Sequence, residues 1–315
     1  MRRDMILAST ALALWGAGSA TAQDRGTALP TGQALTPLAA PGARFAPLVA
    51  RTGPNPAYIA DGAAAIAVSP NGREMLVLTS GFNRYNGPDG KLVLAQSGQY
   101  LFRYRIDAKG PTWLQTLTMP NSYSGVAWSP DGTRIVVGGG VDDVVHVFEK
   151  GASGTFASVG KPIALGHNKT GNGADVLPQA AGIAISPDGT RALVANYYND
   201  SVSLIDLTRG TVLVEQDLRP GKIDAAQAGV AGGENPFAIV WRDATHAYVS
   251  APRDRQIVAL EVTGEAIKVG TRIATLGPPT ALLLDGKARR LYATEDNADR
   301  LAVIDTAHDR LVMEP

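Results

Sequence analysis

The stretch Gly-Ile-Ala-Ile-Ser-Pro-Asp-Gly at residues 182–189 decides the fold of this chain of 315 residues. Closely similar text stands at four other places, namely Ala-Ile-Ala-Val-Ser-Pro-Asn-Gly at 65–72, Gly-Val-Ala-Trp-Ser-Pro-Asp-Gly at 125–132, and degenerate copies from Phe237 and from Thr280. The copies are about 43 to 60 residues apart, a period that is typical of folds assembled from one repeated supersecondary unit. The repeat therefore organises nearly everything after residue 60.

Each repeat predicts four antiparallel strands. In the copy at residue 182 the strand segments are 182–185, 191–196, 201–207 and 211–218. They are rich in β-branched and aliphatic residues, and Ser-Pro-Asp-Gly between the first two suits a type I turn. No stretch has the apolar 3.6-residue period of a helix of ordinary length.

Apolar residues fall on both faces of the second and third strands, so both faces of each sheet should be buried. Four-stranded sheets buried on both faces and repeated in this way are the blades of a β-propeller. A β-sandwich is the alternative, but it would not need the same strand–turn–strand text five times. We therefore predict an all-β chain with a β-propeller over residues 60–315 and blades that start near residues 64, 125, 182, 237 and 280.

The residues before the propeller predict export. Arg2 and Arg3 precede an apolar run over residues 5–17, which is too short to span a bilayer that needs ~20 residues. Ala20-Thr21-Ala22 fits a small-residue cleavage site, so residues 1–22 read as a signal peptide of a periplasmic or secreted protein. A short membrane anchor or a misassigned start is the alternative. Residues 23–59 read as an extended lead-in rich in Pro, Gly and Ala that could contribute a closing strand.

Composition excludes several classes of function. Lys+Arg and Asp+Glu are 29 each, which argues against a nucleic-acid partner. The absence of Cys excludes disulfides, Cys-ligated zinc and iron–sulfur clusters. The 35 Gly and 20 Pro, with 45% hydrophobic residues, indicate a turn-rich β protein and not a disordered chain.

Motifs for catalysis are missing from the sequence. The four histidines, His146, His167, His246 and His308, lack the close spacing of metal ligands. The Gly-rich loop at 166–173 lacks the Gly-Lys-Ser/Thr ending of a phosphate loop, and no Gly-x-Ser-x-Gly elbow is present. We predict no catalytic residue, no metal and no cofactor, and we expect no transmembrane segment after signal cleavage.

Residues 186–196 and 199–206 resemble the YVTN (YncE-like) β-propeller repeat family, whose wider relatives are the lactonase-like propellers. The segments 40–48, 78–84, 139–143 and 217–224 are similar to one subgroup, exported bacterial proteins that join an N-terminal propeller to a C-terminal phosphoesterase domain of the alkaline-phosphatase superfamily. In that subgroup the metal and nucleophile motifs belong to the phosphoesterase domain. None of them occurs in this chain, so the resemblance transfers no catalytic residue.

The resemblance also implies an expectation about architecture. Propellers of this family usually have seven blades, whereas five repeats are readable here. We expect an incomplete seven-bladed propeller. The alternative is that five blades close by themselves.

One end of the propeller is the predicted binding face. The connections after the second strands and between blades are long, whereas the turns between first and second strands are short, and long loops in compact domains tend to carry function. Candidate ligand- or partner-binding residues on this long-loop face are Asn83, Arg84, Asp142, Asp143, His167, Asn196, Tyr197, Asp200, Arg219, Lys222, Arg253 and Asp254. The alternative for Asn and Asp is that they only make local turns.

The sequence therefore favours an exported binding or scaffold module that recognises a protein, a peptide or a small ligand at its long-loop face. We expect no catalysis by this chain alone. The alternatives are the propeller portion of a phosphoesterase and a lactonase-like hydrolase.

Overall fold

The computed structural model describes residues 46–53, 55–81, 83–108 and 110–314, and the backbone of two short paired strands, β1 (Thr27–Ala28) and β2 (Ala34–Leu35). The predicted signal peptide and most of the lead-in lie outside the described residues. The chain divides into two units, Met1–Pro47 and Leu48–Pro315. All that follows concerns the second unit.

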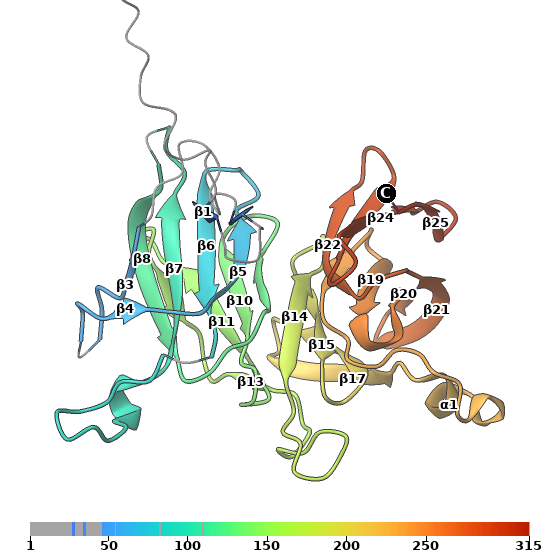
Figure 1. The fold of residues 1–315 in the computed structure, drawn as a ribbon, viewed down its shortest axis with the longest axis horizontal. Helices are drawn as coiled ribbons and strands as arrows, with labels where there is room; N and C mark the ends of the chain where they lie inside the picture. Colours follow the sequence, from blue (N-terminus) through green and yellow to red (C-terminus); the bar gives the residue numbers. More distant parts are fainter. Residues whose placement is uncertain are drawn as a thin grey trace, which may run out of the picture. The chain divides into compact units, whose positions relative to one another are not determined.

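This unit contains a five-bladed β-propeller of four-stranded antiparallel sheets, which confirms the predicted all-β propeller (Figure 1). The first sheet comprises β5 (Ala63–Val68), β6 (Glu74–Thr79), β7 (Gln99–Arg105) and β8 (Thr112–Met119). The second comprises β9 (Val126–Trp128), β10 (Arg134–Gly138), β11 (Val144–Lys150) and an outermost strand split into β12 (Phe156–Ser158) and β13 (Ile163–Ala164). The third comprises β14 (Ala180–Ile185), β15 (Arg191–Asn196), β16 (Ser201–Asp206) and β17 (Thr211–Asp217).

The fourth sheet comprises β18 (Ile239–Trp241), β19 (His246–Ala251), β20 (Gln256–Thr263) and β21 (Ala266–Ala274). The fifth comprises β22 (Pro279–Asp285), β23 (Arg290–Glu295), β24 (Arg300–Asp305) and β25 (Arg310–Met313). Helical structure among the described residues is limited to α1 (Pro220–Ile223) and the single turns η1 (Leu94–Gln96), η2 (Ala225–Gln227) and η3 (Pro252–Asp254).

The Ser-Pro-Asp-Gly text makes the turn that its residues predict. In the third sheet the Gly189 N–H donates to the Ser186 carbonyl at 2.9 Å, which closes the turn. The Ser186 hydroxyl accepts from the Arg191 N–H at 3.0 Å and donates to Asp188. The second strand therefore starts in a fixed register, and its observed range, Arg191–Asn196, is the predicted one.

The cores lie between neighbouring sheets. Leu76, Leu78 and Leu101 of the first sheet pack on Trp128 and Ile135 of the second. Three similar clusters join the second sheet to the third, the third to the fourth and the fourth to the fifth. Alternating side chains of each middle sheet thus enter two different cores, which is why β15 and β16 are apolar on both faces and almost wholly buried.

Tryptophans join some of the innermost strands. The indole N–H of Trp128 in β9 donates to the Ala67 carbonyl of β5 at 3.2 Å, and Trp241 in β18 donates to the Ala184 carbonyl of β14 at 3.0 Å. Each indole therefore packs in a core and also satisfies a carbonyl of the preceding sheet.

Arginines also join neighbouring sheets, close to the turns between first and second strands. In each of the first four sheets one guanidinium donates from Nη1 to a turn carbonyl of the following sheet. These bonds are Arg103 to Gly154 at 2.9 Å, Arg134 to Gly189 at 3.5 Å, Arg191 to Gly264 at 2.9 Å and Arg242 to Thr306 at 3.1 Å. We call these four bonds the arginine stitches.

A short hairpin covers part of the first sheet. It consists of β3 (Leu48–Val49) and β4 (Ile59–Ala60), and it packs on the face of that sheet that does not contact the second sheet. Tyr58 of the hairpin stacks on Tyr100 of β7, with ring centroids 5.9 Å apart.

The two end sheets leave apolar side chains exposed. Ile66 and Val68 of β5 are 67% and 56% exposed, and Leu283 of β22 is 69% exposed. The expectation that both faces of every sheet are buried therefore holds for the middle sheets and is wrong for these two innermost strands.

Candidate functional site

Four connections lie where a second strand ends or an innermost strand begins. They run over residues 80–98, 165–179, 197–200 and 218–238, and they carry most of the predicted site residues (Figure 1). Three of them have 15 to 21 residues, whereas 197–200 is a four-residue turn and the connections between first and second strands have four or five residues. We keep the name long-loop face for the end of the propeller that these four connections form.

His167 links two neighbouring sheets at this face. Its ring lies between two carboxylates, with Nδ1 at 2.5 Å from Asp143 and Nε2 at 3.0 Å from Glu215. The Asp143 carboxylate also accepts from the His167 N–H at 2.8 Å. Asp143 belongs to the β10–β11 turn of the second sheet and Glu215 to β17 of the third, so the His167 side chain bridges the two sheets.

These contacts keep the His167 ring positively charged. Burial alone would lower its pKa, since only 6% of the side chain is exposed, but the hydrogen bonds to Asp143 and Glu215 outweigh burial and raise the pKa to about 9. Burial would raise the pKa of Glu215, but hydrogen bonds from His167 and Ser201 lower it. At neutral pH the charged His167 ring thus lies between the buried Asp143 and the partly exposed Glu215.

A second buried carboxylate, Asp200, connects three of the long connections. It accepts from the Asn172 amide at 2.9 Å and from the Asn235 N–H at 2.9 Å, and Arg219 lies 3.6 Å away. Arg219 also forms an ion pair with Asp217. We call these five residues the Asp200 network.

The segment before β18 extends this network to η3. Glu234 pairs with the Arg253 guanidinium at 2.7 Å, and the Glu234 N–H donates to Asp254 at 2.8 Å. The next residue, Asn235, donates from its amide to the Tyr197 carbonyl at 3.2 Å. Tyr197, Asp200, Arg219, Arg253 and Asp254 of the predicted set are therefore brought together through two residues that the sequence did not single out.

Four aromatic rings pack beside the Asp200 network. Tyr123, Tyr197 and Phe237 meet edge to face, with centroids 5.7 to 6.0 Å apart, and Tyr198 packs on Tyr197 at 4.8 Å. Tyr123, Tyr197 and Phe237 are half-buried, and Tyr198 is 43% exposed. We call these four residues the aromatic cluster.

The phenol groups of Tyr123 and Tyr197 stay protonated. Burial and the neighbouring phenols raise the pKa of both, although Arg253 opposes the shift at Tyr197. No hydrogen bond joins the hydroxyls of Tyr123, Tyr197 or Tyr198 to another described residue. These hydroxyls therefore remain able to donate to a ligand.

The aromatic cluster borders the centre of the propeller. A cavity of about 370 Å³ is lined by Ala64–Ile66, Ser124–Val126, Gly182–Ile183, Phe237–Ile239 and Thr280–Leu282, which come from or adjoin the five innermost strands. Phe237 belongs to both the cavity and the cluster. A cavity of this size falls within the range of small-ligand sites.

Five predicted site residues belong neither to the His167 contacts nor to the Asp200 network and its extension. Asn83 is buried and bonds to Asp61 and Gln99 in the first sheet, and Asn196 is buried and bonds to Ser201 and Ser203. Asp142 accepts from Asn121 at 2.8 Å. Arg84 and Lys222 are exposed, without an ion pair to any described residue.

His146 is a buried residue of β11. Burial lowers its pKa, and no described residue bonds its Nε2. The part of the chain that the structure describes has no group of three His, Asp or Glu arranged to hold a metal ion. It also has no helix that is long and apolar enough to cross a membrane.

The arrangement is suited to recognition. The hydrogen bonds of His167 and of the Asp200 carboxylate hold the connections of the long-loop face in place. Tyr198 of the aromatic cluster and Arg253 remain exposed on this face. Sequence reasoning missed Tyr123, Phe237, Glu215 and Glu234. The aromatic residues directly before two innermost strands, in Ser-Tyr-Ser-Gly and Asn-Pro-Phe-Ala, were a signal that could have found the first two.

Comparison with known proteins shows the fold alone. No protein-family model and no curated protein matches the sequence. Among solved structures, the periplasmic gluconolactonase of Pseudomonas aeruginosa is similar, with 17% identity, a TM-score of 0.60 and coverage of 84% of this chain and 75% of that one. A protein of unknown function from Desulfotomaculum acetoxidans is also similar, with 16% identity, a TM-score of 0.58 and coverage of 80% of this chain and 71% of that one. The WD40 repeats of RRP9 are similar too, with 11% identity, a TM-score of 0.54 and coverage of 81% of this chain and 63% of that one.

Proposed function

We propose that this chain is a binding module that recognises a peptide segment of a partner protein through the aromatic cluster and Arg253. The observation that supports this most is a half-exposed aromatic group mounted on connections that buried carboxylates hold in place. Tyr and Arg are the residue types that dominate the energy of protein interfaces. A rigid frame also lowers the entropy cost of binding, because less of the surface must become ordered.

The proposal is tested by selecting binders from a displayed library of random short peptides. We expect enriched peptides whose affinity falls about tenfold or more in Tyr198→Ala and in Arg253→Ala, since each removes an exposed anchor. Arg105→Ala is the matched control, because Arg105 is also an exposed, ion-paired arginine but is the last residue of β7 in the first sheet. Peptides that bind all three variants equally well would contradict the proposal.

A lactonase activity is the second candidate, and the likeness to a gluconolactonase favours it. The fold is shared with proteins of other kinds, however, and fold does not determine chemistry. The test is hydrolysis of glucono-1,5-lactone followed in a pH-stat. We expect no acceleration over the spontaneous rate, and a saturable acceleration would favour the lactonase.

We further propose a relationship to the propeller portion of exported propeller–phosphoesterase proteins, which rests on the sequence segments quoted above. On this proposal the chain has no phosphoesterase chemistry of its own. Metal-dependent hydrolysis of p-nitrophenyl phosphate by the purified chain would contradict it.

We also propose that the chain is exported and that its signal peptide is cleaved after Ala22. The support is the basic, apolar and small-residue order of residues 1–22. N-terminal sequencing of the protein from its native cell envelope or culture medium should give Gln23 first. An intact N-terminus at Met1 would contradict the proposal.

Finally, we propose that the five sheets form part of a larger, seven-bladed ring. The arginine stitches support this, because each of the first four sheets donates to the sheet that follows. Arg290 is the first residue of β23, as Arg134 and Arg191 are of β10 and β15, but its Nη1 bonds only to the carbonyl of its neighbour Arg289 and lies 3.4 Å from Asp305 of its own sheet. Beside it, Leu283 is exposed. A further sheet would cover this face.

Thiol labelling tests the larger ring, since a chain without Cys gives no background. Ile66→Cys and Leu283→Cys should react with a maleimide as fast as Lys268→Cys in the purified chain, because Lys268 is an exposed residue of β21. In native cells the first two should be protected and the third should not. Equal labelling of all three there would contradict the proposal.

A further inference from the structure

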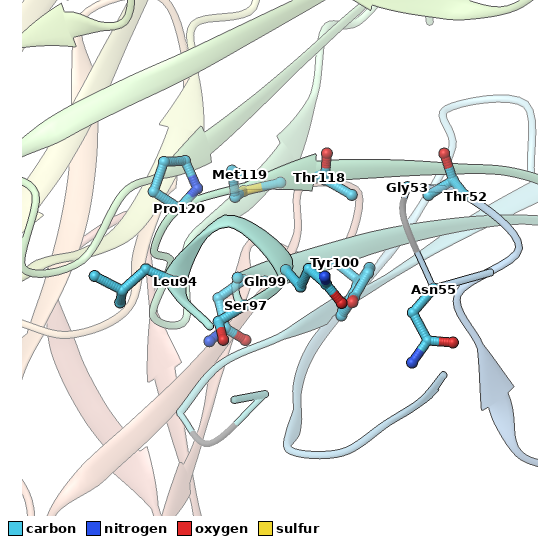
Figure 2. Close-up of a pocket in the computed structure, with 12 residues that line it drawn as sticks. Thr52, Gly53, Asn55, Leu94, Ser97, Gln99, Tyr100, Thr118, Met119 and Pro120 are labelled. Carbon is cyan, nitrogen blue, oxygen red and sulfur yellow. The ribbon is translucent and has the colours of Figure 1, made fainter. Parts of the chain in front are cut away.

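A second pocket lies on the first sheet, away from the aromatic cluster. Its volume is about 330 Å³, and it is bounded by the loop of the β3–β4 hairpin, by η1 and by the ends of β7 and β8. Figure 2 shows Thr52, Gly53 and Asn55 on one side, Leu94 and Ser97 on the other, Thr118, Met119 and Pro120 along a third, and Gln99 and Tyr100 between them. The other two lining residues are Gln96 and Gly98, and the pocket is large enough for a small ligand.

The lining of this pocket carries no charge. None of its twelve residues is Asp, Glu, Lys, Arg or His. A charged ligand would therefore lose water without gaining a counter-charge, which is costly. The pocket selects against ions.

The same lining is rich in neutral polar groups. No hydrogen bond joins the side chains of Thr52, Asn55, Gln96 or Thr118 to another described residue. Hydroxyl and amide groups both donate and accept. A purely apolar ligand would leave these groups without partners, so it fits the pocket poorly.

Tyr100 brings an accessible hydroxyl on a largely buried ring to this pocket. The residue is only 8% exposed, and its ring is held between Tyr58 at 5.9 Å and Phe102 at 5.8 Å. Its hydroxyl bonds to no described residue, and burial followed by the nearby Tyr58 raises its pKa, so it stays a neutral donor. A fixed, unpartnered hydroxyl in a pocket wall is the kind of group that orients a ligand.

The pocket also offers an apolar side. Leu94 is 77% exposed and Met119 lies opposite the hairpin loop. A fitting ligand therefore has hydroxyl groups on its rim and C–H groups on a face. Both properties belong to an uncharged saccharide ring.

We propose that this pocket binds an uncharged saccharide ring, oriented by the Tyr100 hydroxyl and the amides of Asn55 and Gln96. The site is separate from the proposed peptide-binding surface, and it includes no group placed to open a lactone. It adds a small-ligand function to the first sheet that does not depend on the partner proposed above.

Saturation-transfer NMR on the full chain tests the ligand class. The probes are glucose, galactose, mannose and N-acetylglucosamine, with glucuronate as a charged counterpart of glucose. We expect at least one neutral sugar to bind in a saturable manner, and glucuronate to bind at least about tenfold more weakly than glucose. Absence of binding by all four neutral sugars, or equal binding of glucuronate, would overturn the proposal.

Variants then place the sugar in this pocket. Tyr100→Phe keeps the ring stack but removes the hydroxyl, and we expect about fivefold weaker binding. Tyr104→Phe is the matched control, because Tyr104 belongs to the same strand and the same stack but does not line the pocket. Gln96→Lys should restore glucuronate binding by supplying a cation. An unchanged affinity in Tyr100→Phe, with all three variants melting like wild type, would refute this location.

Discussion

At the scale of single residues, the charge of buried groups links stability to pH. His167 has a pKa raised from 6.5 to about 9, so the folded state holds its proton more tightly than the unfolded state does. Its contribution to stability is therefore complete below pH 6.5 and is lost as the pH rises through about 9. We expect the free energy of unfolding to fall by ~2 kcal/mol from about pH 7 to about pH 10.

His167→Gln should remove this alkaline loss. Urea unfolding measured across that pH range checks the prediction, with His246→Gln as the control for a half-exposed histidine outside the cluster. An alkaline loss of unchanged size in His167→Gln would show that another group is responsible.

Glu295 is a buried carboxyl whose contribution to stability also depends on pH. Its pKa is raised by burial and by the adjacent Glu314 carboxyl, while Oε2 accepts from the Gly277 N–H at 2.7 Å. Since the folded state favours the protonated form, its contribution is present at low pH and lost as the pH rises through the raised pKa. Glu295→Gln, which cannot lose a proton, should therefore stabilise the protein by ~1 kcal/mol at about pH 8 and leave it unchanged at about pH 4.

Unfolding by urea at the two pH values measures this difference. Glu261→Gln is the control, because Glu261 is an exposed residue with a 3.9 Å pair to Lys268. Equal changes in the two variants would argue against a burial effect at Glu295.

At the scale of secondary-structure elements, close approach between innermost strands is the main constraint. The Gly182 N–H donates to the Phe237 carbonyl at 2.8 Å, and a Cβ on Gly182 would lie 2.1 Å from that oxygen. Gly182→Ala must therefore push β14 and the approach to β18 apart. We expect a loss of about 2–3 kcal/mol in stability, measured by urea unfolding.

Gly286→Ala is the control for this prediction. Gly286 is a glycine directly after the innermost strand β22, and a Cβ there would meet no atom within 4 Å. Similar losses in both variants would mean that backbone flexibility, and not contact between strands, decides the outcome.

The sequence was sufficient to predict what depends on neighbouring residues. Ser186 to Arg191 fixes its own turn within six residues, and the alternation of apolar side chains marks each strand. The arginine stitches could not be read, because they join residues 51 to 73 positions apart. For the same reason Asp143 and Asp200, expected to contact a ligand, proved to be buried partners of His167 and of Asn172 and Arg219.

At the scale of the whole molecule, stability should vary along the series of sheets. A middle sheet is packed on both faces, whereas the fifth has one exposed face, and in repeat proteins stability comes largely from contacts between neighbours. We expect backbone amides of β15 and β16 to exchange with deuterium more slowly than those of β22 and β23. Exchange followed by mass spectrometry measures this, and uniform protection across all five sheets would contradict it.

The arginine stitches give the series of sheets a direction. Every donor reaches toward the C-terminal side of the chain, and every accepting carbonyl sits in a turn of the following repeat. A repeat that is duplicated within the chain would bring both its own donor and its own acceptor, so the new joints would be complete without changes in older repeats. The molecule is thus built so that its length can evolve by whole units, and only the two terminal units need special surfaces.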